Sequence, residues 1–118
     1  MDAAVAEQFS TAWLDAWNAH DFDAILGHFA DDVVFTSPVA ERIVEGSGGA
    51  IRGKAALRSY WREGLRRSPD LHFEIEGLYL GVNTIVINYR NHSAALVNEV
   101  LIFDGPLVAK GHATYLGP

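Results

Sequence analysis

Residues 71–116 have the sequence LHFEIEGLYLGVNTIVINYRNHSAALVNEVLIFDGPLVAKGHATYL and contain four runs of branched and aromatic residues. Short polar segments, GVN, NHSA and DGP, separate these runs. Runs of this composition with such short connections are typical of antiparallel β-strands. We therefore expect four strands, at about 71–80, 84–90, 95–103 and 107–116.

The segment before these strands has the periodicity of helices. Apolar side chains recur every four residues across 3–18, which predicts an amphipathic helix. Asp21 is a favourable N-cap for a second helix, whose predicted buried stripe consists of Phe22, Ile25, Leu26 and Phe29. A third helix is expected from Lys54 to Arg67.

Two further segments lie between the second and third helices. Residues 33–38, VVFTSP, predict a short strand that Pro38 ends, because proline cannot donate to a strand ladder. Residues 39–53 contain EGSGGAIRG and are expected to form a loop, and a short strand on either side of it is left open.

Helices followed by a series of strands are typical of an α+β domain in which the helices cover one face of a sheet. A chain of 118 residues suits a single domain, here residues 1–118. The last two predicted strands are apolar on both faces, and helices can cover only one of these faces. We therefore expect a second copy to cover the other face, so that the protein forms a homodimer.

The composition argues against several classes of function. The formal net charge of −6 is unsuited to a general nucleic-acid surface or an anionic membrane surface, because both need a basic face. The chain has no cysteine, and its histidines and glycines show no metal-ligand or phosphate-binding spacing, so no cofactor is expected. The sequence shows neither a signal peptide nor a membrane span, and we expect a cytoplasmic protein.

One acidic side chain lies in the middle of an apolar strand. It is Glu99, in the segment LVNEVLIFD at residues 96–104. An ionised carboxylate among apolar neighbours is unfavourable unless it is paired, hydrogen-bonded or protonated. Either Glu99 faces a pocket with a raised pKa, or it pairs with Lys110 or His112 of the following strand.

Three segments carry a family resemblance: AWNAHDFDAILGHFADDVVFTSP at 16–38, IRGKAALRSYW at 51–61 and EVLIFDG at 99–105. Together they resemble the nuclear transport factor 2-like superfamily, nearest to its SnoaL-like and ketosteroid isomerase-like branches. The resemblance implies a cone, in which a curved antiparallel sheet wraps around three N-terminal helices and encloses an apolar pocket. It also implies that the convex side of the sheet is the dimer interface.

The resemblance further implies roles for three positions in the pocket. The isomerases carry a general base at the end of the first strand, where this chain has Ser37, which is no base without a partner but can hold a water or a ligand oxygen. Their oxyanion-binding tyrosine corresponds to Trp13, whose indole N–H can donate but cannot act as an acid. Glu99 matches the position of a protonated acid that hydrogen-bonds the reacting oxygen.

His112 is a further catalytic candidate, because a histidine beside a carboxylate can form an acid–base pair; the alternative is that it satisfies a buried hydrogen bond. Tyr60, Tyr89 and Tyr115 could each supply a hydroxyl group to the cavity, and the resemblance favours the first two. The residues expected to contact a ligand are Trp13, Trp17, Phe35, Tyr60, Trp61, Ile87, Tyr89, Leu101 and Phe103.

These features favour a protein that binds a small hydrophobic molecule. If it is an enzyme, we expect cofactor-free acid–base chemistry such as isomerisation, cyclisation, dehydration or epoxide opening. Glu99 would be the donor or base, with Ser37 or His112 in support. The alternative is a non-catalytic dimer of the same fold, a ligand carrier or scaffold whose cavity is partly filled by its own side chains.

Overall fold

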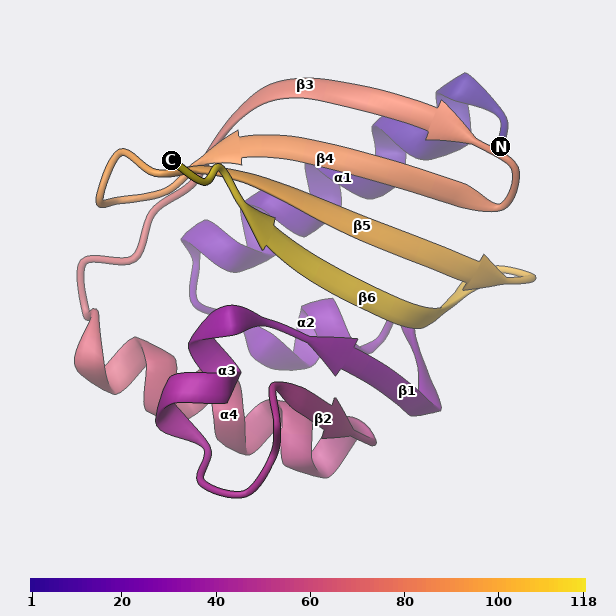
Figure 1. Cartoon of the computed structure of the whole chain (residues 1–118). Helices are drawn as coiled ribbons and strands as arrows, with labels where there is room; N and C mark the ends of the chain where they lie inside the picture. Colours follow the sequence, from indigo (N-terminus) through magenta and orange to yellow (C-terminus); the bar gives the residue numbers. More distant parts are fainter.

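A computed structural model describes the whole chain, residues 1–118 (Figure 1). The helices are α1 (Ala3–Asn18), α2 (Phe22–Leu26), α3 (Pro38–Ile43) and α4 (Lys54–Arg67). The strands are β1 (Phe29–Thr36), β2 (Ala50–Arg52), β3 (Glu74–Gly81), β4 (Thr84–Arg90), β5 (Leu96–Asp104) and β6 (Leu107–Tyr115). None of the helices has both the length and the apolar character needed to cross a membrane.

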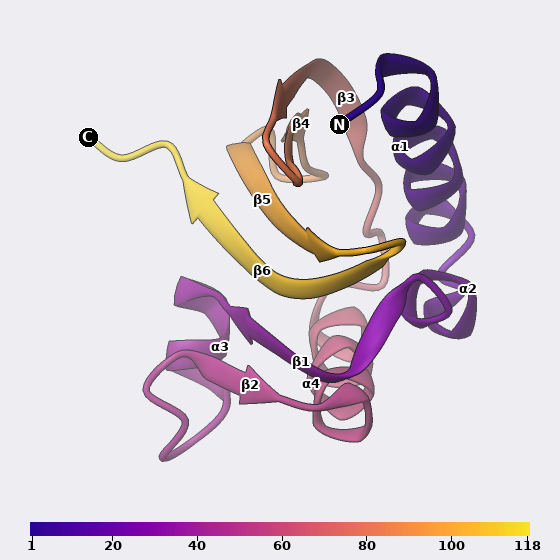
Figure 2. The same cartoon turned by 90° about the vertical axis from the view of Figure 1, so that its right-hand side faces the viewer.

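All the strands form one curved sheet in the order β2-β1-β6-β5-β4-β3. The sheet does not close on itself, and α1 lies along its concave side (Figure 2). α1 packs against β3, while α4 packs against β1 and β2 at the other end of the sheet. The α+β class and the cone-shaped arrangement expected from the sequence are therefore confirmed.

One strand pairing differs from the wholly antiparallel sheet that we expected. β1 pairs with β6 in parallel, so that Val34 and Thr36 lie opposite Lys110 and His112. Parallel neighbours need a long crossover connection, and the chain from α3 to β5 provides it. Strand direction across such a separation leaves no local pattern in the sequence, which is why the expectation was wrong here.

The predicted second helix is too long. α2 ends at Leu26, and Phe29 is the first residue of β1 rather than part of the helical stripe. Phe29 is nevertheless buried, as the pattern required. A buried aromatic residue fits the apolar period of a helix end and of a strand start equally well, so periodicity could not distinguish the two.

The expected loop at 39–53 contains a helix as well as a strand. Ser37 caps α3 by accepting a hydrogen bond from the Val39 N–H at 3.1 Å. Pro38 occupies the first turn, where its missing N–H is not needed. The prediction of a loop relied on glycines, which begin only at Gly46. β2, one of the two strands left open, pairs antiparallel with β1.

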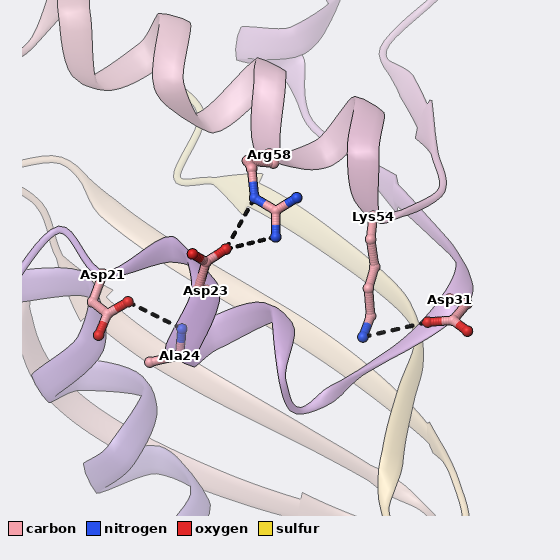
Figure 3. Close-up of polar contacts among 6 residues, drawn as sticks. All are labelled: Asp21, Asp23, Ala24, Asp31, Lys54 and Arg58. Atoms are coloured by element: carbon pink, nitrogen blue, oxygen red, sulfur yellow. Dashed lines mark hydrogen bonds and ion pairs between the residues drawn. The ribbon is translucent and has the colours of Figure 1, made fainter.

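Surface ion pairs hold α4 against the elements before it (Figure 3). The Arg58 guanidinium lies 2.6 Å from the Asp23 carboxylate on α2, and the Lys54 ammonium lies 3.5 Å from Asp31 on β1. Asp21 accepts a hydrogen bond from a backbone N–H of α2 at 3.1 Å and acts as the expected N-cap. Such exposed contacts contribute about 1 kcal/mol or less each, so they orient α4 more than they stabilise it.

The core between helices and sheet is a cluster of aromatic rings. The ring centroid of Trp61 on α4 lies 4.9 Å from that of Trp17 on α1 and 6.1 Å from that of Phe35 on β1. The centroids of Phe73 and Tyr89 are 4.4 Å apart. Rings at these separations attract one another beyond the gain from burial alone. The cluster therefore ties the helices to the concave face of the sheet.

Gly111 of β6 provides a test of this packing. A Cβ atom at Gly111 would lie 2.7 Å from Cδ2 of Phe35, which is closer than carbon atoms approach. We expect Gly111→Ala to lower the free energy of unfolding by about 1–3 kcal/mol, because the buried Phe35 ring must move. Denaturation in urea measures the change.

Gly64→Ala in α4 is the matched control. A Cβ atom at Gly64 would meet nothing within 4 Å, and glycine is unfavourable inside a helix. This variant is expected to be as stable as the wild type or to gain up to about 1 kcal/mol. Equal stability of the two alanine variants would contradict the packing described for Gly111.

Candidate functional site

A cavity of about 360 Å³ lies between α3, α4 and the concave face of the sheet. This volume lies at the small end of the range for small-molecule sites. Eighteen residues line the cavity, and ten of them are hydrophobic. The residues come from every part of the chain, so the site forms only when the helices have packed onto the sheet.

The cavity includes some of the predicted ligand-binding residues and excludes others. Those that line it are Trp17, Phe35, Tyr60, Trp61 and Tyr89. Those that do not are Trp13, Ile87, Leu101 and Phe103, all of which are buried in the core. The centroid of Phe103 lies 5.1 Å from that of Phe9 on α1, which shows how α1 fills one end of the cone. Only the other end remains hollow.

Glu99 reaches the cavity because of its place in the sheet. In the register of β4, β5 and β6, Glu99 lies opposite Ile87 on one side and Ala113 on the other. Its side chain is only 3% exposed and lines the cavity. The carboxyl group is therefore held in the cavity wall, which is the first of the two alternatives that the sequence left open.

No basic residue pairs with Glu99. His112 lies opposite Val100 and Lys110 lies opposite Ile102, so both side chains belong to the other face of the sheet. The alternative in which one of them neutralises Glu99 is therefore wrong. The single hydrogen bond to the carboxyl group comes from the Tyr89 hydroxyl, which donates to Oε1 over 3.5 Å.

This environment keeps Glu99 protonated at neutral pH. Burial raises the pKa of Glu99 to about 8, and the weak hydrogen bond from Tyr89 only partly opposes the rise. Burial, together with the nearby Glu99, also raises the pKa of Tyr89 well above its usual value. At pH 7 both groups thus carry protons, and Glu99 acts as a hydrogen-bond donor.

Ser37 lines the cavity but already has two partners. Its Oγ accepts a hydrogen bond from the Val39 N–H and another from the Tyr60 hydroxyl, both at 3.1 Å. Burial is the main cause that raises the pKa of Tyr60, so its hydroxyl stays protonated. Apart from these two contacts the Ser37 hydroxyl has no protein partner, so it can donate a hydrogen bond to a ligand.

The structure does not bring His112 to the cavity. Its Nδ1 lies 2.7 Å from Oγ1 of Thr36, its neighbour on β1, on the convex side of the sheet. The interpretation of His112 as an acid–base partner of Glu99 is therefore wrong, because the strand register places the two side chains on opposite faces of the sheet. The alternative, in which His112 only satisfies a hydrogen bond, agrees with its contact to Thr36. No group of three or more histidine, aspartate or glutamate side chains is placed to hold a metal ion.

Sequence reasoning missed several residues of the cavity mouth. Arg42 on α3 lines the cavity, as do His92 and its neighbours in the β4–β5 turn. Tyr115 on β6 also lines it and was among the hydroxyl candidates from the sequence. Arg42 was hidden because α3 falls in the expected loop, although the Ser-Pro pair that begins α3 is a helix-start signal. The composition of the β4–β5 segment predicts a turn, but it does not indicate that this turn lies over the cavity.

The raised pKa of Glu99 predicts how stability depends on pH. In the unfolded chain Glu99 ionises near pH 4.5, whereas in the folded protein it ionises at about 8. Between these values the folded state binds more protons, so the free energy of unfolding falls as pH rises, by up to about 1.4 kcal/mol per pH unit. Below pH 4.5 and above about pH 8, Glu99 does not make the free energy of unfolding depend on pH.

Denaturation at several pH values tests this prediction. Glu99→Gln has no group to ionise, and we expect it to lose this part of the slope while the wild type keeps it. Asp104→Asn, which removes an exposed carboxylate from the same strand, is the control and should retain the wild-type slope. Identical slopes for the wild type and Glu99→Gln would show that the carboxyl group ionises normally.

Comparison with known proteins agrees with the geometry described above. The sequence model of the SnoaL-like domain matches residues 10–111. The crystal structure of a SnoaL-like protein of unknown function from Burkholderia thailandensis is 45% identical, with a TM-score of 0.92, and the match covers 98% of each chain. The chain matches none of the curated proteins compared with it.

More distant structures share the fold alone. A putative polyketide cyclase from Sinorhizobium meliloti has a TM-score of 0.76 at 14% identity, and the match covers 91% of this chain and 94% of that one. AclR, a putative hydroxylase from Streptomyces galilaeus, also has a TM-score of 0.76, at 17% identity, with 98% and 91% covered. The fold therefore occurs with more than one proposed chemistry. From the extent of the domain match and the 45% identical relative, the chain belongs to the SnoaL-like family of the nuclear transport factor 2-like superfamily.

Proposed function

We propose that this protein binds a small hydrophobic molecule in the cavity and hydrogen-bonds one of its oxygen atoms with the protonated carboxyl group of Glu99. The observation that carries the proposal is a buried acid without a cation at the wall of an aromatic cavity. An apolar cavity with few convergent polar groups is typical of small-molecule sites.

The hydrogen-bond inventory of the cavity supports an oxygen-bearing ligand. At neutral pH the hydroxyls of Tyr60 and Tyr89 are used within the protein, on Ser37 and Glu99. Apart from these contacts, the Ser37 hydroxyl and the protonated carboxyl group of Glu99 have no protein acceptor within hydrogen-bonding distance. Surplus donors in a buried site are satisfied by a ligand that brings acceptors, such as a carbonyl or epoxide oxygen.

Such an arrangement suits cofactor-free acid catalysis. A proton on Glu99 polarises a carbonyl or epoxide oxygen, and the same group stabilises the negative charge that develops on this oxygen during reaction. The surrounding rings, including Trp17 and Trp61, exclude water and strengthen this interaction. Isomerisation, cyclisation, dehydration and epoxide opening all fit this role of Glu99.

A second candidate function is binding without turnover. It is favoured by the position of Ser37, whose oxygen caps α3 and therefore cannot act as a base. His112, the other residue proposed to assist Glu99, lies on the convex side of the sheet. A carrier or sensor would need only the hydrogen bond from Glu99 and the aromatic walls.

Substitution of Glu99 tests the proposal with a panel of small ketones, lactones and epoxides. Calorimetry is expected to find at least one ligand, and Glu99→Leu should weaken its binding about tenfold, because a buried hydrogen bond is lost. If a compound is converted, Glu99→Gln should slow the reaction by about 100-fold or more. Product analysis distinguishes an enzyme, which converts the ligand, from a carrier, which only binds it.

Two further variants make the test specific to this cavity. Gly64 lines the cavity and a Cβ atom there would meet nothing within 4 Å, so Gly64→Phe should bring a ring to the cavity and block the same ligand. Asp104→Asn should leave binding and turnover unchanged. Full affinity in both Glu99→Leu and Gly64→Phe would mean that the ligand binds elsewhere and would refute the proposal.

We also propose that the protein is a homodimer through the convex face of the sheet. No helix covers this face of β4 and β5 (Figure 2). Val86 and Val100 lie opposite each other on it, and Ile102 follows on the same face of β5. These side chains are half-buried within one chain, and a second copy would remove them from water.

Light scattering combined with gel filtration tests the dimer. The wild type is expected to have twice the mass of the chain, and Val100→Arg should give a monomer because it places a charge in the interface. Thr11→Arg on the exposed side of α1 adds the same charge and should leave the dimer intact. A monomeric wild type would refute this proposal and leave the cavity proposal untouched.

A further inference from the structure

A cation without a partner lies at the mouth of the cavity. Arg42 on α3 is exposed and lines the opening, and its guanidinium makes no hydrogen bond or ion pair with the protein. The only carboxyl group among the lining residues is Glu99. An acidic protein thus places an uncompensated positive charge at the entrance of its cavity.

Arg42 differs in this respect from the other basic residues. The chain has nine lysines and arginines, and Lys54, Arg58, Arg66, Arg67 and Arg90 form ion pairs with nearby carboxylates. The four without such a pair are Arg42, Arg52, Arg62 and Lys110, and only the first of these lines the cavity. Among the basic residues without an ion pair, Arg42 alone is thus placed where it can contact a ligand in the cavity.

Two tyrosines connect the mouth with Glu99. Burial raises the pKa of Tyr115 to about 12, with Tyr60 and Glu99 adding to the rise and Arg42 opposing it. The pKa of Tyr60 is likewise raised, mainly by burial, and is also shifted in opposite directions by Glu99 and Arg42. Both tyrosines line the cavity together with Glu99 and Arg42. The cavity therefore holds hydroxyl groups in addition to its one carboxyl group and its one guanidinium group.

We propose that the ligand is a ring-bearing carboxylic acid whose carboxylate binds Arg42 at the mouth while an uncharged oxygen of the same molecule lies against Glu99. Aromatic or alicyclic keto acids are the simplest members of this class. A guanidinium group matches a carboxylate with two parallel hydrogen bonds, which neutral ligands cannot use. The ring occupies the space between the two polar groups, among the aromatic walls. This inference rests on the proposed function, because it adds a second contact to the ligand of Glu99.

Matched acids and esters test the inference. The probes are 4-acetylbenzoate and 6-acetyl-2-naphthoate, whose ring lies between the ketone and the carboxylate, each beside its methyl ester, which keeps the ring and the ketone but lacks the charge. Calorimetry at neutral pH and low salt is expected to show that the wild type binds an acid about three- to tenfold more tightly than its ester. Arg42→Met should bind the acid no better than the ester, and added salt should reduce the preference of the wild type.

A second variant separates a local contact from the effect of net charge. Arg62→Met removes an unpaired arginine from α4 outside the cavity and lowers the net charge equally, and it should keep the preference for the acid. The inference is overturned if the wild type binds acid and ester equally, or if Arg62→Met loses the preference as fully as Arg42→Met. In either case, ester binding that Glu99→Leu weakens still supports the proposed function. If neither an acid nor an ester binds, both proposals fail for this class of ligand.

Discussion

The packing of one indole ring supports both the fold and the cavity. The centroid of Trp61 on α4 lies 4.9 Å from Trp17, 5.8 Å from Phe29 and 6.1 Å from Phe35, so a single ring contacts α1 and two points of β1. The same ring forms part of the cavity wall. Because these contacts fix where the helices rest on the sheet, they also fix how much of the concave face is left uncovered. Stability and cavity shape therefore depend on the same contacts, and a substitution at Trp61 would change both together.

Glu99 shows how an apolar wall can hold an acid without a neutralising cation. A buried ionised carboxylate would be strongly unfavourable, and the structure avoids this state because the group keeps its proton at neutral pH. The protonated group still needs partners, and Tyr89 supplies only one long hydrogen bond. A leucine or isoleucine here would fill the wall without any unsatisfied polar atom. The unmet donor capacity of Glu99 is therefore a cost to stability that a ligand can offset, which is typical of functional sites.

The short helix α3 links the two ends of the cavity. Ser37 follows β1 and caps α3, and its side chain also lines the cavity. One turn later the same helix presents Arg42 at the opening. The hydrogen bond from Tyr60 to Ser37 joins this cap to α4. Ser37 thus gives the chain a helix start, and with it a cation at the mouth of the cavity.

Local patterns in the sequence determined much of this protein. The four-residue apolar period gave the bounds of α1 and α4, and the alternation along β5 placed Glu99 on the same face as Leu101 and Phe103, all of which are buried. Only the tertiary structure decided that β1 runs parallel to β6, that His112 faces away from Glu99, and that Arg42 stands at the cavity mouth. It also decided that Trp61 borders the hollow end while Leu101 does not, although both side chains are buried. Periodicity records which side of an element is buried, because that depends on the geometry of the element alone. A cavity exists where side chains from distant elements fail to meet, and this depends on how those elements pack together.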